Sequence, residues 1–315
     1  MISQNLVICV CICLLCLNVT GSVISSDPGN SDVTSIDDTC IVPMNISLLS
    51  LDDYVNSATE YARCAGKEAA VELFNDPSGP FTYDDLYIFA CSADGIAIAH
   101  PFDRELLNAN WMNLTDDNGV GIKKTEISLA QQGGGRFYYM WNIPGQNETP
   151  HLKLSQIEPV NDGWYIGGGI YLLNQTAKFT DEDRNKLVSF VTQARDYAQE
   201  YGFDAATAEF SNPQGDFIDG QLYIYAYDRN GVTVAHPFQP ELIGTDRIGF
   251  ADTNGVELIR NLRDVAFDWG GGFTYFMYVN PNENNMMELK LGYVLPVDEN
   301  WFVGSGIYQN QTDLN

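Results

Sequence analysis

Positive charge and histidine are both scarce in this chain. Its 315 residues include 16 Lys and Arg against 42 Asp and Glu, a formal net charge of −26, and only 3 His. Such a surface repels phosphate backbones and anionic lipid, so we expect neither nucleic-acid binding nor electrostatic docking on membranes. We interpret the acidity itself as the solvated coat of a globular protein. Because cations are few, a cation that recurs at equivalent places is informative.

Only one apolar run stands out in length, and it lies at the N-terminus. It covers residues 6–17, which is too short for a membrane-spanning helix but fits the core of a secretory signal, although no Lys or Arg precedes it. We predict a signal peptide over 1–22, a flexible linker over 23–47, and a secreted or cell-surface location. Five glycosylation sequons after the predicted signal peptide agree with export: Asn45, Asn113, Asn147, Asn174 and Asn310.

Cysteine is absent from the second half of the chain. Four of the seven cysteines lie inside the apolar run, and Cys40, Cys64 and Cys91 remain. At most one disulfide can form among these three, which leaves one thiol over. No spacing typical of metal ligands is present, so we expect no metal site and no cofactor.

The sequence contains a long internal repeat. The segment Ala-His-Pro-Phe at 99–102 returns at 235–238, so that His100 and His236 lie 136 residues apart. An offset of this length is too long for a solenoid unit and is typical of a duplicated domain. We expect the first copy to cover residues 48–176 and the second 177–315.

Both copies show the same order of predicted elements. Capping residues at Ser50 and Thr180 begin a long helix, which in the first copy is predicted to run to about Phe74. A hairpin with an Asp-Gly or Asn-Gly turn follows, and then a short helix, a triple glycine and three further strands. Glycines inside the last apolar strand indicate close approach by another element or by a ligand. Antiparallel strands with helices on one side predict an α+β fold.

Several motifs recur in this order: HPF-x-x-E-L, D-x-N-G, G-G-G before aromatic residues, L-K-L, and a closing W-x-(V/I)-G-x-G-I-Y. Together they resemble the Cache domain, and more narrowly the single-Cache type 2 group of extracellular sensor domains, over residues 48–176 and 177–312. The resemblance implies two tandem PAS-like modules, each with a long N-terminal helix, an antiparallel sheet, and a pocket for small organic anions or similar metabolites.

The repeated cations point to that pocket. Lys153 lies between two leucines and recurs as Lys290, the only lysine after Lys186. Alternation along a strand places both leucines on one face and the lysine on the other, toward the side that ligands use in this fold. Two alternatives stay open: each lysine pairs with a local carboxylate, and each recurring histidine bonds to backbone beside its proline.

Aromatic side chains would form the pocket walls, and we expect each set to divide between core and pocket. Trp111 aligns with Arg247; if that loop closes the pocket, the second copy prefers a more negative ligand. The candidate ligand-binding residues are Tyr87, Phe89, His100, Trp111, Tyr139, Trp141 and Lys153 in the first copy, and Tyr223, Tyr225, His236, Arg247, Phe276, Tyr278 and Lys290 in the second.

Two functions are consistent with these observations. The chain carries no nucleophile elbow, no HExxH motif and no repeated carboxylate pair, so we do not expect an enzyme. The first hypothesis is an exported protein that binds a small organic acid, has no output domain of its own, and hands ligand or information to a membrane receptor or transporter. The alternative is a glycosylated surface or adhesion protein without a small ligand. A pocket with lysine on its floor favours the first, and a sheet face filled by its own aromatics favours the second.

Overall fold

The computed structural model describes residues 40–42, 49–146, 149–161, 163–175, 177–280 and 286–309. The predicted signal peptide, most of the predicted linker, and the sequons at Asn45, Asn147 and Asn310 lie outside the described residues. Within the described ranges, no helix has the length and hydropathy needed to cross a bilayer.

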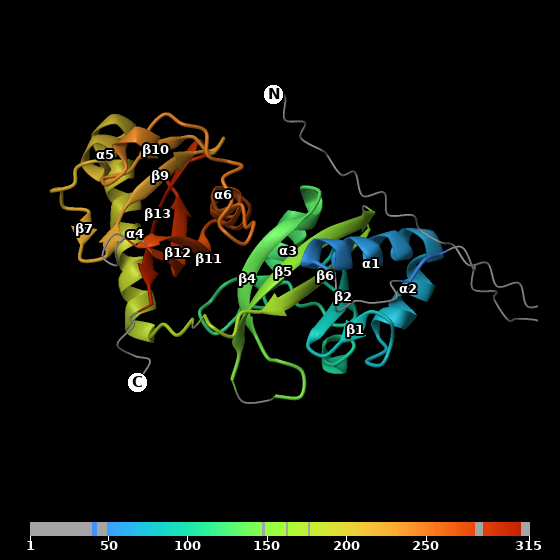
Figure 1. Cartoon of the computed structure of the whole chain (residues 1–315). Coiled ribbons are helices and arrows are strands. Elements are labelled where there is room, and N and C mark those ends of the chain that lie inside the picture. The colour runs from blue at the N-terminus through green and yellow to red at the C-terminus, as the bar shows by residue number, and fades with distance from the viewer. Residues whose placement is uncertain are drawn as a thin grey trace, which may run out of the picture. The chain divides into compact units, whose positions relative to one another are not determined.

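Module 1 contains the first copy of the repeat. Its elements are α1 (Leu51–Ala65), α2 (Lys67–Phe74), β1 (Thr82–Tyr83), β2 (Leu86–Ser92), β3 (Ala97–Ala99), the 3₁₀ helix η2 (Arg104–Leu106), α3 (Ile122–Gln131), β4 (Gly135–Trp141), β5 (His151–Asn161) and β6 (Trp164–Tyr171) (Figure 1). The sheet is antiparallel with strand order β1-β2-β6-β5-β4, and β3 pairs with β2.

Module 2 repeats this arrangement. Its elements are α4 (Asp181–Tyr201), α5 (Phe203–Phe210), β7 (Ile218–Asp219), β8 (Leu222–Tyr223), β9 (Tyr225–Asp228), β10 (Thr233–Ala235), η3 (Pro240–Leu242), α6 (Leu258–Trp269), β11 (Gly272–Asn280), β12 (Met286–Pro296) and β13 (Trp301–Tyr308). The main sheet is antiparallel with order β10-β9-β13-β12-β11, and β7 pairs separately with β8. The predicted α+β fold is confirmed.

The long N-terminal helices begin where the capping residues predict but end earlier than expected. The side chain of Ser50 accepts a hydrogen bond from a backbone N–H in the first turn of α1, and Thr180 forms a reciprocal capping box with Asp183. The predicted single helix to Phe74 is wrong, because Gly66 adopts φ 85° and divides it into α1 and α2. Gly202 divides the second copy in the same way. A positive φ is accessible to glycine and interrupts helical propagation.

Each main sheet has two buried faces. In module 1 the first face packs under α1, which lies against β5 and β6 (Figure 1). Residues such as Ile88 of β2 and Ile166 of β6 point into this core. The opposite face carries Tyr87, Phe89 and other aromatic side chains, which pack with α3. This second face is the side of the sheet that carries the candidate site.

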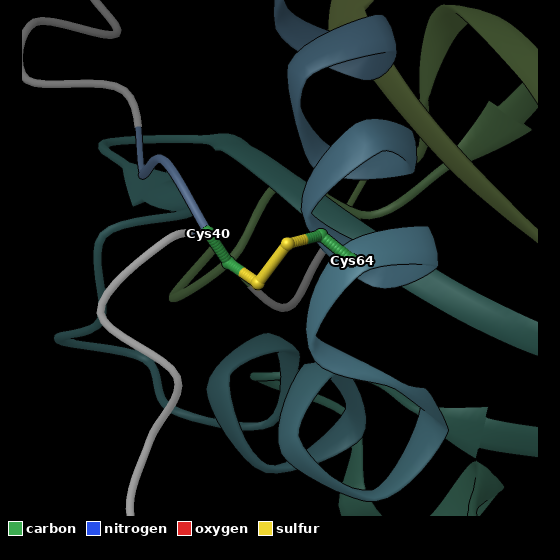
Figure 2. The surroundings of a disulfide bond; sticks show 2 residues. All are labelled: Cys40 and Cys64. Carbon is green, nitrogen blue, oxygen red and sulfur yellow. A yellow bond between two sulfur atoms is a disulfide. The ribbon is translucent and has the colours of Figure 1, made fainter.

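Module 1 contains a disulfide bond. Cys40 is bonded to Cys64 in the last turn of α1 (Figure 2), while Cys91 is a buried free thiol. Closing a loop of this length restricts the unfolded chain and stabilises the fold by about 3 kcal/mol. No equivalent bond exists in module 2, which has no cysteine.

Candidate functional site

Each module contains a small cavity between the second sheet face, the histidine-bearing loop and the short helix that follows it. The cavity volume is about 20 Å³ in module 1 and about 10 Å³ in module 2. Volumes of this size hold roughly one water molecule, so any ligand of more than one heavy atom requires side chains to move. The module 1 cavity is lined by Tyr87, Phe89, Cys91, Ala97, Ala99, His100, Leu106, Ile122, Lys123, Glu126, Tyr139 and Trp141. The module 2 cavity is lined by Tyr223, Tyr225, Tyr227, His236, Leu258, Leu262, Phe276, Tyr278 and Lys290.

Lys290 lies at the floor of the module 2 cavity. Its side chain comes from the middle of β12, is only 1% exposed, and forms no ion pair within the described part of the chain. Nζ lies 3.1 Å from the hydroxyl of Tyr223 and 4.6 Å from the ring centroid of Tyr308. Burial lowers the pKa of Lys290 from 10.5 to about 7, because the charged ammonium has lost its hydration.

Lys153 occupies the equivalent place in module 1 but is covered. It is fully buried, and its Nζ has no hydrogen-bond partner among the described residues. The ring centroid of Tyr87, which lines the cavity, lies 3.8 Å from Nζ, and Lys153 itself is not part of the cavity wall. Burial lowers the pKa of Lys153 to about 7, although Asp85 and Glu126 partly oppose that shift.

Two glycines make room for these lysines. A Cβ atom on Gly169 of β6 would lie 3.0 Å from Cε of Lys153, and one on Gly306 of β13 would lie 2.8 Å from Cε of Lys290. Side chains essentially never approach so closely, so any larger residue at these places would displace the lysine stem. The close approach predicted at these glycines is therefore present, and it comes from the neighbouring strand.

The recurring histidines bond to backbone and also line the cavities. Nδ1 of His100 accepts the backbone N–H of Asp103 at 2.9 Å, and Nδ1 of His236 accepts that of Gln239 at 3.0 Å. Burial, reinforced by the nearby lysine, lowers the pKa of both histidines from 6.5 to about 3. A neutral imidazole that accepts at Nδ1 carries its proton on Nε2. Each histidine is therefore an uncharged donor at physiological pH.

The aromatic residues do not divide as expected. All eight candidates line a cavity, four in each module. The expectation of a split was wrong because residues two apart on a strand share a face, as Tyr139 and Trp141 do. The intervening residues, such as Ile88 and Tyr138, are the ones that enter other hydrophobic clusters.

Trp111 and Arg247 do not line the cavities. The indole N–H of Trp111 donates to the carbonyl of Leu106 at 2.8 Å, so Trp111 supports a lining residue from behind. The guanidinium of Arg247 lies 3.8 Å from the ring centroid of Phe250. The pKa of His236 is lowered mainly by burial and then by the charge of Lys290, and the charge of Arg247 contributes the smallest part. Arg247 thus acts on the module 2 site through its electrostatic field.

A polar cluster that no repeated motif predicts lies on the helical wall of the module 1 cavity. Nζ of Lys123 lies 2.7 Å from Oε2 of Glu126 and 3.1 Å from Sγ of Cys91, and the hydroxyl of Tyr165 donates to the same glutamate oxygen at 3.0 Å. Lys123 and Glu126 are 6% and 1% exposed. Burial disfavours the ammonium of Lys123, but the adjacent Cys91 and Glu126 outweigh it and raise its pKa. The ion pair is therefore formed in the cavity wall.

The equivalent positions in module 2 are apolar. Ile259 and Leu262 stand where module 1 has Lys123 and Glu126, and both are buried on α6. A comparison of the two copies for differences, in place of recurrences, would have drawn attention to this pair. Lys123 has no cationic counterpart in the second copy, so recurrence does not reveal it.

Comparison with known proteins agrees with this architecture. The model of the family "Single Cache domain 2" matches residues 49–185 and 199–314. The chain therefore belongs to the single Cache domain 2 family and carries two regions of it. This confirms the resemblance found in the sequence.

Two curated relatives match over part of their length. The sensor histidine kinase MctS of Rhizobium johnstonii is 29% identical over 129 residues, which cover 41% of this chain and 27% of the relative. The methyl-accepting chemotaxis protein McpP of Pseudomonas putida is 30% identical over 129 residues, 40% of this chain and 24% of that protein. The chain thus spans about a quarter of the length of these relatives.

Similar solved structures include a methyl-accepting chemotaxis protein from Vibrio parahaemolyticus (26% identity, TM-score 0.36, covering 41% of this chain and 89% of that one). A Cache chemosensory domain solved for carboxylic acid recognition shows 20% identity and a TM-score of 0.33, over 39% of this chain and 86% of that one.

Proposed function

We propose that the protein is an exported small-molecule binding protein whose module 2 binds a short-chain carboxylate through Lys290. The observation that carries the proposal is a buried lysine without an ion pair in the described residues, at the floor of an aromatic cavity. A buried ammonium without a counter-ion is costly, and a carboxylate ligand would supply the missing charge.

The remaining donors fit the same ligand. His236 and Tyr223 line the cavity with Lys290, and a neutral imidazole and a phenol each have one proton to donate to a carboxylate oxygen. The aromatic wall suits a short aliphatic chain, and because the cavity volume is only about 10 Å³, wall side chains move to admit it.

We propose that this binding serves in sensing. The curated relatives are a sensor kinase and a chemotaxis protein, and one similar solved domain is described by its recognition of carboxylic acids. We propose that this chain supplies the ligand-binding step and that a membrane receptor or transporter is its partner. The chemistry is binding, with no bond made or broken.

The proposed location outside the cytoplasm has support beyond the apolar N-terminal run. The bond between Cys40 and Cys64 requires an oxidising compartment to form and persist in most organisms. N-terminal sequencing of the native protein tests this: a chain that begins between about residues 21 and 27 agrees with export, and an intact Met1 in a cytoplasmic fraction contradicts it.

Two observations favour a second function. The cavities are small because aromatic side chains fill most of the space, as expected for a surface or adhesion protein that uses the fold without a ligand. Two sequon residues in the described part, Asn113 and Asn174, are exposed. Binding measurements separate the two functions.

The test is calorimetric titration of the full chain with acetate and propionate. Removing a buried charge partner costs on the order of 2–5 kcal/mol of binding free energy, so Lys290→Met should weaken the module 2 site by about thirtyfold or more. Arg260→Met is the matched control, because Arg260 pairs with Glu257 at 2.8 Å and lies outside the cavity. Equal affinities for wild type and both variants, or no binding to wild type, would contradict the proposal.

A further inference from the structure

The Lys123–Glu126 pair gives the module 1 cavity a chemistry that module 2 lacks. Both side chains line the cavity and both are almost fully buried. The pair is held by the helix α3, where the two residues are one turn apart, and by the hydroxyl of Tyr165 on the sheet. It therefore presents a fixed donor and a fixed acceptor side by side.

Lys123 and Glu126 can form further hydrogen bonds besides those within the cluster. An ammonium has three donors, and Lys123 directs two contacts to Glu126 and Cys91. A carboxylate has about four acceptor positions, and the contacts described for the Glu126 side chain come from Lys123 and Tyr165 at one oxygen, Oε2. A ligand group that both accepts and donates would complement the pair, and a hydroxyl is the smallest group that does both.

We propose that module 1 binds a short hydroxy acid, whereas module 2 binds an aliphatic acid, and that Lys123 and Glu126 set this difference. The inference rests on the proposed carboxylate-binding function. The carboxylate end of the ligand lies toward His100 and Lys153, with Tyr87 shifting to admit it, and the hydroxyl lies toward α3. In module 2 the part of the ligand that faces the helix meets Leu262 of the cavity wall. The leucine side chain cannot form a hydrogen bond with a hydroxyl.

Hydrogen bonding makes this selectivity asymmetric. A site built to bond a hydroxyl discriminates strongly against the analogue without it, because buried polar groups are then left without that partner, while an apolar site rejects an added hydroxyl less strongly. We expect module 1 to prefer the hydroxy acid by at least about tenfold. Module 2 should prefer the aliphatic acid by a smaller factor.

The experiment uses the full chain and two probes that differ by one hydroxyl, propionate and lactate. Lys290→Met leaves module 1 to be titrated, and Lys153→Met leaves module 2. We expect lactate to bind the first variant at least about tenfold more tightly than propionate, and propionate to bind the second variant at least as tightly as lactate.

A paired substitution then tests the residues themselves. Lys123→Ile with Glu126→Leu, made together in the Lys290→Met chain, copies the wall of module 2 and leaves no buried charge unpaired. The lactate preference should disappear while propionate still binds. Should the pair fail to fold, Tyr165→Phe, which removes one bond to Glu126, should reduce the preference without changing propionate affinity.

The outcomes separate the two proposals. If neither acid binds wild type, or if binding does not depend on Lys153 and Lys290, the proposed function fails. If both acids bind through those lysines but module 1 shows no preference for lactate, or keeps the preference after Lys123 and Glu126 are replaced, only the inference about hydroxy acids is overturned.

Discussion

The two sites share a buried lysine, a neutral histidine bonded to backbone and four aromatic side chains in equivalent places, and they differ in their helical wall. The lysine lines the cavity in module 2, whereas in module 1 it lies behind Tyr87 and outside the cavity wall. On the helix, module 1 has the ion pair of Lys123 and Glu126, whereas module 2 has Ile259 and Leu262. In the proposed function, the shared residues bind the carboxylate of the ligand, and the differing residues select among ligands. The duplication thus separates the residues proposed to bind the ligand from those proposed to set its selectivity.

We expect the largest effect for Lys123, which forms an ion pair with Glu126, whereas Lys290 forms none among the described residues. Lys123→Met leaves Glu126 buried without its partner, which typically costs about 3–5 kcal/mol of unfolding free energy. Thermal or denaturant unfolding should therefore show a marked loss of stability. Combining it with Glu126→Leu should recover most of the loss. If Lys123→Met alone is neutral, the ion pair contributes nothing and the comparison of the two walls loses its basis.

For Lys290→Met we expect the opposite change, an increase in the unfolding free energy. The pKa of Lys290 falls from 10.5 to about 7 on burial, so between these values the unfolded chain binds more protons and wild-type stability rises with pH. Methionine removes that dependence and should raise the unfolding free energy by about 4 kcal/mol at pH 7. The advantage should shrink toward zero as pH approaches 10. Unfolding curves of both proteins at pH 7, 8.5 and 10 measure this, and a constant difference would show that the lysine is not desolvated.

A smaller effect tests the feature that both modules share. Gly306→Ala places a Cβ 2.8 Å from Cε of Lys290 and 2.9 Å from the carbonyl oxygen of Leu291, and overpacking of this kind costs about 1–3 kcal/mol. Gly249→Ala is the matched control in the same module, because nothing lies within 4 Å of its added Cβ. Equal melting temperatures for the two variants would mean that the strand has room for a larger residue.

Recurrence in the sequence predicted the part of the molecule that both copies retain. The repeated motifs gave the α+β fold, the helix starts at Ser50 and Thr180, and the family. They could not show that Tyr87 covers Lys153, because that depends on side-chain packing between β2 and β5 and leaves no pattern in the chain. They also could not show the wall of module 1, since Lys123 and Glu126 occur in one copy only. The early helix end at Gly66 was readable in principle, because Gly202 recurs with it.

The disulfide in module 1 determines how mechanical load would enter the fold. Cys40 is bonded to Cys64 at the far end of α1 (Figure 2), so tension applied to the chain before Cys40 passes through the sulfur atoms directly to the last turn of that helix. The 23 residues between the two cysteines lie outside this path and bear none of the force. The first turns of α1 therefore cannot be peeled from the sheet by pulling on the N-terminal segment, as long as the bond stays oxidised. Reduction would return the load to Ser50 and the start of the helix.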